Sequence, residues 1–390
     1  MFETLAQELQ NLAARDLRRR LTEVEEVLPR GRVRLGEQVL LNLSSNDYLG
    51  LSQDPRLIDA AQTAAARWGV GAGASRLVAG HLALHREVES KLAAFKGTEA
   101  AVIFSTGYMA NLGTISALVG AGDTVFCDKL NHASIYDGIK LSGANLARFP
   151  HRDMNRLESL LQKAGAGRKL IITDSVFSVD GDVATLKDIV ELKDRYGAVL
   201  MIDEAHATGV LGPKGAGLAD ELGLTQRVEV HMGTFSKALG SLGGYVAGDQ
   251  RLIDYLHNRA RSFIYSTAMP PPVLGAIGAA LDVISQEPEH RRYLLDEAKS
   301  FRETLTQAGF DLLGSETQIV PVLVGENART LEFAGRLRER GILAVAFRPP
   351  TVTPGQARVR FSLSAAHDRD DLAAARWAIT EVGRDMGLIP

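Results

Sequence analysis

The chain has 390 residues, of which 45% are hydrophobic and 23% charged, as expected for a globular protein of two or so domains. Its formal net charge of −3 argues against nucleic acid as the main partner. A single cysteine, Cys127, excludes an internal disulfide framework. No apolar run is long enough for a membrane span, and the N-terminus lacks a signal-peptide pattern. We therefore expect a cytoplasmic protein without a membrane partner.

Apolar residues at three- and four-residue spacing predict a helix over residues 2–20, which ends in three arginines at 18–20. By composition these arginines are a solvated helix end, where the helix dipole favours cations. A strand at 39–43 leads into Ser44-Ser45-Asn46-Asp47-Tyr48-Leu49-Gly50. On local chemistry alone, Asn46 is as plausible in a polar turn as facing a substrate.

The middle of the chain alternates between apolar strands and helices joined by short glycine turns. Five strand–helix units in succession predict an α/β fold with a mainly parallel sheet and helices on both of its faces. The glycine-rich string at 69–76 lacks the spacing of a dinucleotide-binding fingerprint, and no strand precedes it. The predicted strands cover residues 101–104, 124–128, 169–173, 198–202 and 229–231.

Polar residues follow these strands, and ligands gather at the carboxyl ends of parallel strands. After the first strand, Gly107 and Tyr108 open a helix whose free amides and positive dipole end favour an anion such as a phosphate. An ordinary strand-to-helix turn explains these two residues equally well. His132 follows the second strand, and Ser178 follows the third. A single histidine in a loop is by itself more often a surface residue than a catalytic one.

Lys237 lies in a loop at the end of the last of these strands, between the hydroxyls of Thr234 and Ser236. A lysine in this position is suited to a depressed pKa and to attack on a carbonyl. The strand at 198–202 ends directly in an acid, Asp203. Together they are what pyridoxal 5'-phosphate needs, because the carboxylate keeps the pyridine nitrogen protonated and the lysine forms the Schiff base.

A metal site is not expected, because the string Asp203-Glu204-Ala205-His206 has no second histidine or cysteine at ligand spacing. His206 is instead three residues from the acid, so one turn of chain brings both to the cofactor. Beyond residue 248 the chain reads as helical, with a long helix from Pro272. A smaller α+β domain follows, with strands at 319–324, 342–345 and 358–362, a helix near 329–340 and a final helix capped by Asp368. We divide the chain into an N-terminal segment (1–45), a large cofactor-binding domain (46–270) and a small C-terminal domain (271–390).

The strings Asp-Glu-Ala-His-Ala-Thr-Gly at 203–209 and Thr-Phe-Ser-Lys-Ala-Leu-Gly at 234–240 resemble fold-type I pyridoxal-phosphate enzymes, and within them the α-oxoamine synthases. The resemblance extends from Arg18 to the C-terminal helix. That family condenses an amino acid with an acyl thioester and releases carbon dioxide. The resemblance therefore implies a decarboxylating acyltransferase that works as a homodimer with active sites at the interface.

The resemblance also assigns cofactor contacts. It implies that His132 stacks on the pyridine ring and that Ser178 lies near the phenolic oxygen of that ring. His206 would bond the same oxygen or lie beside the thioester carbonyl. Either Ser266 or Thr267 would cross the dimer interface to the phosphate of the other subunit.

Substrate contacts follow from the same resemblance. Arg18 would reach the acyl substrate, Asn46 would face the substrate, and Arg360 would bind the amino-acid carboxylate, for which a guanidinium fork is suited. We expect Arg358 to point the other way from its strand, into a structural ion pair.

The string Arg-Pro-Pro-Thr at 348–351 points to the biotin-pathway branch, with Arg348 and Thr351 as substrate contacts. That branch joins L-alanine to a pimeloyl thioester carried by coenzyme A or by acyl carrier protein. The alternatives within the family are a glycine C-acetyltransferase and a 5-aminolevulinate synthase. Further alternatives are an aminotransferase and a non-catalytic regulator that binds pyridoxal phosphate.

Overall fold

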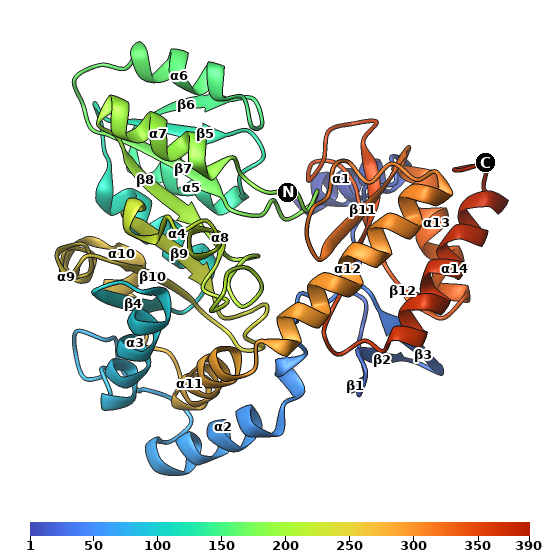
Figure 1. Ribbon diagram of the computed structural model, residues 1–390, viewed down its shortest axis with the longest axis horizontal. Coiled ribbons are helices and arrows are strands. Elements are labelled where there is room, and N and C mark those ends of the chain that lie inside the picture. Colours follow the sequence, from blue (N-terminus) through green and yellow to red (C-terminus); the bar gives the residue numbers. More distant parts are fainter. The chain divides into compact units, whose positions relative to one another are not determined.

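The computed structural model describes residues 1–390, which form two compact units (Figure 1). The large unit comprises Leu49–Ser178 and Val183–Arg292, and the small unit comprises Met1–Tyr48, Val179–Asp182 and Tyr293–Pro390. The predicted division into three parts at residues 45 and 270 stays a prediction.

A 7-stranded sheet forms the centre of the large unit, in the order β4-β10-β9-β8-β7-β5-β6. The strands from β9 to β6 pair in parallel, whereas β10 is antiparallel to both β4 and β9. This arrangement confirms the predicted α/β fold with a mainly parallel sheet. The strands are β4 (Ala100–Phe104), β5 (Thr124–Asp128), β6 (Asn145–Phe149), β7 (Lys169–Asp174), β8 (Val199–Asp203), β9 (Val230–Thr234) and β10 (Gly244–Gly248).

Both faces of this sheet are covered, because successive side chains on a strand point to opposite faces and here both sets are buried. On one face, Leu170 and Ile172 pack with Ile115, Ile135 and Leu256 from the helices. The strand residues between them are equally buried. The helices of this unit are η1 (Leu51–Gln53), α2 (Pro55–Trp68), α3 (Ala83–Lys96), α4 (Gly107–Leu118), α5 (Ala133–Ser142), α6 (Met154–Gln162), α7 (Leu186–Tyr196), α8 (Leu218–Glu221), η2 (Thr225–Arg227), α9 (Gln250–Arg259), α10 (Arg261–Ile264) and α11 (Pro271–Gln286).

The small unit contains two sheets, ordered β1-β2-β3-β12 and β11-β14-β13. The second is antiparallel throughout, and in the first only the β12–β3 pair is parallel. The elements are α1 (Phe2–Ala14), β1 (Glu26–Leu28), β2 (Arg32–Leu35), β3 (Gln38–Asn42), α12 (Glu289–Ala308, of this unit from Tyr293), β11 (Ile319–Gly325), α13 (Asn327–Glu339), β12 (Ile342–Leu343), β13 (Val345–Phe347), β14 (Ala357–Ser362) and α14 (Arg369–Asp385).

Several elements differ in extent from the prediction. Helix α1 ends at Ala14, and Asp16 follows in a left-handed conformation with φ 54°, so the arginines at 18–20 are not a helix end. The long helix predicted from Pro272 is α11, and the structure adds a second helix, α12, after a break around Pro288, since proline cannot continue a helical hydrogen-bond ladder. The strand predicted at 342–345 is divided between β12 and β13, which join different sheets.

No helix is long and apolar enough to cross a membrane. No group of three or more histidine, cysteine, aspartate or glutamate side chains is placed to hold a metal ion.

Candidate active site

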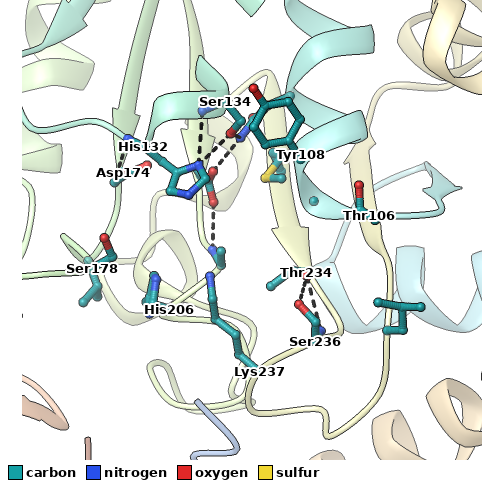
Figure 2. Close-up of a pocket in the computed structure, with 17 residues that line it drawn as sticks. Thr106, Tyr108, His132, Ser134, Asp174, Ser178, His206, Thr234, Ser236 and Lys237 are labelled. Atoms are coloured by element: carbon teal, nitrogen blue, oxygen red, sulfur yellow. Dashed lines mark hydrogen bonds between the residues drawn. The ribbon is translucent and has the colours of Figure 1, made fainter. Parts of the chain in front are cut away.

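A pocket of about 270 Å³ lies at the carboxyl ends of the strands in the large unit (Figure 2). It forms there because the loops that follow β4, β5, β7, β8 and β9 end at the same edge of the sheet. The residues that line it are Thr106, Gly107, Tyr108, Asn111, His132, Ser134, Asp174, Val176, Ser178, Asp203, Ala205, His206, Met232, Thr234, Ser236, Lys237 and Leu242.

The lysine of this pocket is carried by the loop between β9 and β10, which is closed by its own hydrogen bonds. Thr234 Oγ1 donates to the Gly243 carbonyl (2.6 Å), and its oxygen also accepts from the Ser236 amide (3.2 Å). Gly240 N donates to the Lys237 carbonyl (2.9 Å). These contacts fix the loop backbone, so Thr234 and Ser236 position Lys237 at the pocket wall.

The N-terminus of α4 forms one side of the pocket. Thr106 caps the helix by accepting from Met109 N (3.1 Å), and helix geometry leaves the Gly107 and Tyr108 amides without an intrahelical acceptor. A Cβ at Gly244 would lie 2.6 Å from Gly107 Cα, so only glycine at 244 lets β10 pack this closely against the helix start. The amides and the positive end of the helix dipole therefore face the pocket, as an anion site requires.

Two carboxyl groups, Asp174 and Asp203, stand at paired positions on neighbouring strands. Asp203 is 5% exposed, and its two oxygens accept from Asn111 Nδ2 (2.9 Å) and Ala205 N (3.0 Å). Burial and the neighbouring Asp203 charge raise the pKa of Asp174 well above its usual range. The pocket thus has one carboxylate held by two amides and a second carboxyl whose pKa is raised.

His132 is the residue that caps α5, and its ring lies beside Ser134 in the pocket (Figure 2). Its Nδ1 lies 2.7 Å from Ser134 Oγ and 3.3 Å from Ser134 N. Burial lowers the pKa of His132; the Asp203 charge opposes this shift, and the Lys237 charge reinforces it. His206 and Ser178 also line the pocket.

These residues fit pyridoxal phosphate. A cavity of about 150 Å³ is enough to bind benzene in a protein interior, so a pocket of about 270 Å³ has room for a substituted pyridine ring. Its walls supply an amine, a carboxylate held by two amides, and a helix N-terminus, which match the aldehyde, ring nitrogen and phosphate of the cofactor. The predicted cofactor residues of the large unit, apart from Ser266 and Thr267, are therefore together in one pocket.

Ser266 and Thr267 do not line this pocket. They line a separate small cavity, and Thr267 forms a β-bridge with Ser75. Ala268 N donates to the Ala74 carbonyl (3.0 Å), which anchors the segment to the end of the glycine-rich string. The expected contact of Ser266 or Thr267 with another subunit stays a prediction.

The small unit holds the predicted carboxylate-binding arginine. Arg360 donates to Asn46 Oδ1 (3.0 Å), which also accepts from Tyr48 OH (3.1 Å), and the guanidinium lies 4.7 Å from the centre of the Phe347 ring. Burial lowers the pKa of Arg360. The sequence reasoning thus named two residues, Asn46 and Arg360, that form one hydrogen-bonded pair.

Arg358 forms the expected ion pair, with Asp180. Its predicted direction was wrong, because residues two apart on a strand point to the same face, so Arg358 and Arg360 share a face of β14. The ion pair with Asp180, rather than an opposite orientation, distinguishes Arg358 from Arg360.

A second cavity of the small unit, of about 140 Å³, contains two arginines, and we call it the arginine cavity. Arg348 and Thr351 line it, and their contact with the substrate stays a prediction. Arg19 donates to Thr351 Oγ1 (3.3 Å). Arg18 is exposed and does not line it, so its contact with the acyl substrate stays a prediction. The lining residues are Leu17, Arg19, Val345, Ala346, Phe347, Arg348, Pro349 and Thr351.

Sequence reasoning missed four residues of these sites: Asn111, Ser134, Asp174 and Arg19. Asn111 is one helical turn beyond Gly107, so helical spacing from the anion site could have found it. Asp174 ends a buried strand in the same way as Asp203, which is the signal that identified the latter. No sequence signal separates Arg19 from its neighbour Arg18.

Known proteins resemble this chain over its whole length. Residues 38–379 match the model of the family described as aminotransferase class I and II. An 8-amino-7-oxononanoate synthase of Citrifermentans bemidjiense is 50% identical over 391 residues, which cover 100% of both chains. A serine palmitoyltransferase of S. paucimobilis with bound PLP has a TM-score of 0.95 and 31% identity, covering 100% of this chain and 98% of its own.

An 8-amino-7-oxononanoate synthase of Francisella tularensis has a TM-score of 0.78 and 28% identity, over 89% of this chain and 98% of its own. The aminotransferase match and the serine palmitoyltransferase agree with the fold-type I architecture and with pyridoxal phosphate as the cofactor. The chain belongs to the aminotransferase class I and II family and, within it, to the 8-amino-7-oxononanoate synthases.

Proposed function

We propose that the chain condenses L-alanine with a pimeloyl thioester, releasing carbon dioxide, the free thiol carrier and 8-amino-7-oxononanoate for biotin biosynthesis. The observation that carries this proposal is the pocket that places Lys237 and Asp203 together, in a chain half identical to synthases of that name. Bound pyridoxal phosphate supplies an electron-accepting ring that stabilises negative charge at the alanine α-carbon.

The residues of the pocket handle the proton and the charges. Lys237 takes the α-proton of alanine and returns a proton to the same carbon after carbon dioxide has left. Asp203 provides the negative charge opposite the ring nitrogen, since its carboxylate is held in place by two amides. The amides of Gly107 and Tyr108 bind the phosphate at the start of α4.

Three further side chains of the pocket would orient the reacting groups. His132 would stack on the ring and Ser178 would lie near its phenolic oxygen, while His206 would bond the same oxygen or lie beside the thioester carbonyl. The support for these roles is that all three side chains line the pocket.

The small unit supplies substrate recognition in this proposal. Arg360, with Asn46, binds the amino-acid carboxylate, because a buried guanidinium gains most from a bidentate carboxylate partner. Arg348, Thr351 and Arg18 bind the acyl substrate. A pimeloyl group has a distal carboxylate or ester that can use a remote arginine, whereas an acetyl group is too short.

We further propose a homodimer in the cytoplasm with active sites at the interface. The position of Ser266 and Thr267 outside the pocket of their own chain supports a contact in another subunit. Helix α1, whose residues are all unburied, leaves Phe2, Leu5 and Leu9 exposed, as expected for a covered surface in an assembly. The reduced thiol of Cys127 is buried and suits a reducing compartment.

Carbon dioxide release from purified holoenzyme tests the function. L-alanine with a pimeloyl thioester should be turned over, and glycine with acetyl- or succinyl-coenzyme A barely at all. Alanine should be preferred to glycine by about 10- to 200-fold, since one methyl group is worth about 1–3 kcal/mol. Parallel assays with pimeloyl-coenzyme A and the acyl-carrier-protein thioester identify the carrier. Faster turnover of glycine with acetyl-coenzyme A would contradict the substrate assignment.

A further inference from the structure

Asn111 connects two parts of the active site that the proposed mechanism treats separately. It is 1% exposed, and its Nδ2 donates both to Asp203 Oδ2 and to Ser134 Oγ, at 2.9 Å each. A carboxylate accepts hydrogen bonds but cannot donate them, so the amide must present its NH₂ group to Asp203. The buried Asn111 Oδ1 has no partner, which shows that the two donated bonds determine the orientation of the amide.

Ser134 connects the Asn111 amide to His132 through its hydroxyl group. Its oxygen accepts from Asn111, so its single hydrogen is free for His132 Nδ1, at 2.7 Å. The Ser134 backbone amide donates to the same nitrogen, at 3.3 Å. A ring nitrogen that accepts two hydrogen bonds cannot carry a proton itself.

We infer that Asn111 and Ser134 are positioning residues that hold His132 as the neutral imidazole with its proton on Nε2, while holding Asp203 as a hydrogen-bonded carboxylate. The tautomer follows because the Ser134 backbone amide donates to Nδ1, so the Ser134 hydroxyl must donate to the same nitrogen. This completes one chain of contacts, Asp203–Asn111–Ser134–His132, shown in part in Figure 2. The assignment of the His132 tautomer does not depend on which reaction the enzyme catalyses, whereas the importance of that tautomer for catalysis rests on the proposed function.

The neutral state matters for charge placement. An imidazolium at His132 would place a positive charge beside the pyridinium and would compete for the Asp203 carboxylate. A neutral ring removes this competition, so the negative charge of Asp203 remains available to the ring nitrogen. Through one amide group, Asn111 therefore helps to keep His132 uncharged and Asp203 charged.

The test is nitrogen NMR of holoenzyme labelled with ¹⁵N-histidine, in which the His132 signals are assigned by their loss in His132→Gln. The wild type should show an unprotonated Nδ1 and a protonated Nε2. A proton on Nδ1, or on both nitrogens, would overturn the inference whatever the enzyme's activity. If the reaction differs from the one proposed, only the changes in kcat and KM predicted below would fail, and the tautomer would be unaffected. Failure of the inference and failure of the proposed function can therefore be told apart.

Variants test whether the two residues are responsible. Ser134→Ala removes one donor to Nδ1 and should give a mixture of tautomers, with kcat about five- to tenfold lower and KM for alanine within about twofold. Ser134→Thr keeps the hydroxyl and should restore the single tautomer. Asn111→Ala should reproduce the tautomer mixture through its loss of contact with Ser134. An unchanged tautomer in both alanine variants would show that the network does not set it.

A matched control is available on the helix that carries Asn111. Ser116→Ala removes a hydroxyl that bonds only carbonyls of its own helix, including Leu112 O (2.6 Å). This variant should leave the tautomer and kcat unchanged. A change equal to that of Ser134→Ala would mean that any lost hydroxyl in this region perturbs the site, and the inference would fail.

Discussion

The pocket of the large unit and the arginine cavity of the small unit differ in how completely their charged side chains are bonded to neighbouring groups. In the pocket, the Asp203 carboxylate is held by two amides, and Asn111 and Ser134 extend this network to His132. In the arginine cavity, neither Arg19 nor Arg348 forms an ion pair.

The partners of the two arginines are a hydroxyl and a backbone carbonyl. Arg348 donates to the Asp16 carbonyl, Arg19 donates to Thr351, and the buried Nε of Arg348 has no partner. Burial, together with the charge of Arg19, lowers the pKa of Arg348. The pocket is therefore organised before any ligand arrives, whereas the arginine cavity has positive charge that an anionic ligand would neutralise. The difference suggests that the pocket performs the chemistry common to the family, and that the arginine cavity selects the acyl substrate.

The largest expected effect is on the organised pocket. Lys237→Ala removes the base and the amine, so activity should fall by about 10⁴-fold while the fold is retained. In the wild type loaded with pyridoxal phosphate, borohydride reduction and peptide mapping should place the label on Lys237. A label on another lysine would contradict the assignment. Lys214→Ala, at an exposed position of the same unit, is the control and should keep full activity.

The sequence predicted the pocket well because its residues are fixed by local rules. Gly107, His132 and Lys237 each follow a strand and Asp203 ends one, and parallel strands bring their carboxyl ends to one edge. Hydrogen-bond partners such as Asn111 were missed because they depend on which helix face turns toward the pocket.

The small unit was less predictable because its elements are short and its contacts distant in sequence. Helix α1 was extended too far, since the apolar spacing gives no sign of the left-handed Asp16. Arg19, rather than Arg18, lines the arginine cavity, which depends on the path of the chain after that turn. The opposite direction given to Arg358 was an error in applying strand periodicity.

A stability measurement tests whether a buried ion pair next to the pocket stabilises the large unit. Lys96 pairs with Glu204, next to Asp203, with 2% and 0% of the side chains exposed. Lys96→Met leaves the carboxylate buried and uncompensated, so the free energy of unfolding at neutral pH should fall by about 3–5 kcal/mol. Urea unfolding of the cofactor-free protein measures this. Lys91→Met breaks an exposed pair with Asp282 and should cost less than about 1 kcal/mol.

The pH dependence of the same pair has a definite sign. Burial alone would raise the pKa of Glu204, but Lys96 and His231 outweigh burial and lower it from 4.5 to about 2. A depressed folded-state pKa contributes stability that is present above the unfolded value and is lost as the pH falls from about 4.5 to 2. The penalty of Lys96→Met should therefore shrink on acidification through that window. A penalty independent of pH would show that the variant acts by packing instead.

A smaller loss is expected when the acid of the pocket keeps its shape but loses its charge. Asp203→Asn should reduce exchange of the alanine α-proton in deuterated water by about 10²- to 10³-fold, because the charge opposite the ring nitrogen is gone. This assay needs no acyl substrate, so it isolates the pocket from the arginine cavity. Asp188→Asn, on the exposed side of α7, should exchange at the wild-type rate. Near-normal exchange in Asp203→Asn would contradict the role of the carboxylate.

The smallest effects should fall on the arginine cavity and should be confined to the acyl substrate. Arg348→Ala should raise KM for the pimeloyl thioester by about 10- to 100-fold, since a hydrogen bond to a charged group contributes about 1.5–3 kcal/mol. The exchange of the alanine α-proton should stay at the wild-type rate.

Arg18 and Arg19 provide a matched pair within this segment, since both are exposed but only Arg19 lines the arginine cavity. Arg18→Ala should still weaken use of the pimeloyl thioester, but only by about two- to fivefold, as expected for an exposed charge. Arg19→Ala should have the larger effect because it also removes the contact with Thr351. If Arg18→Ala is the more damaging of the two, the acyl group is bound by Arg18 and the arginine cavity is not its site. Loss of alanine proton exchange in any of these variants would instead mean that the two regions are not separable in function.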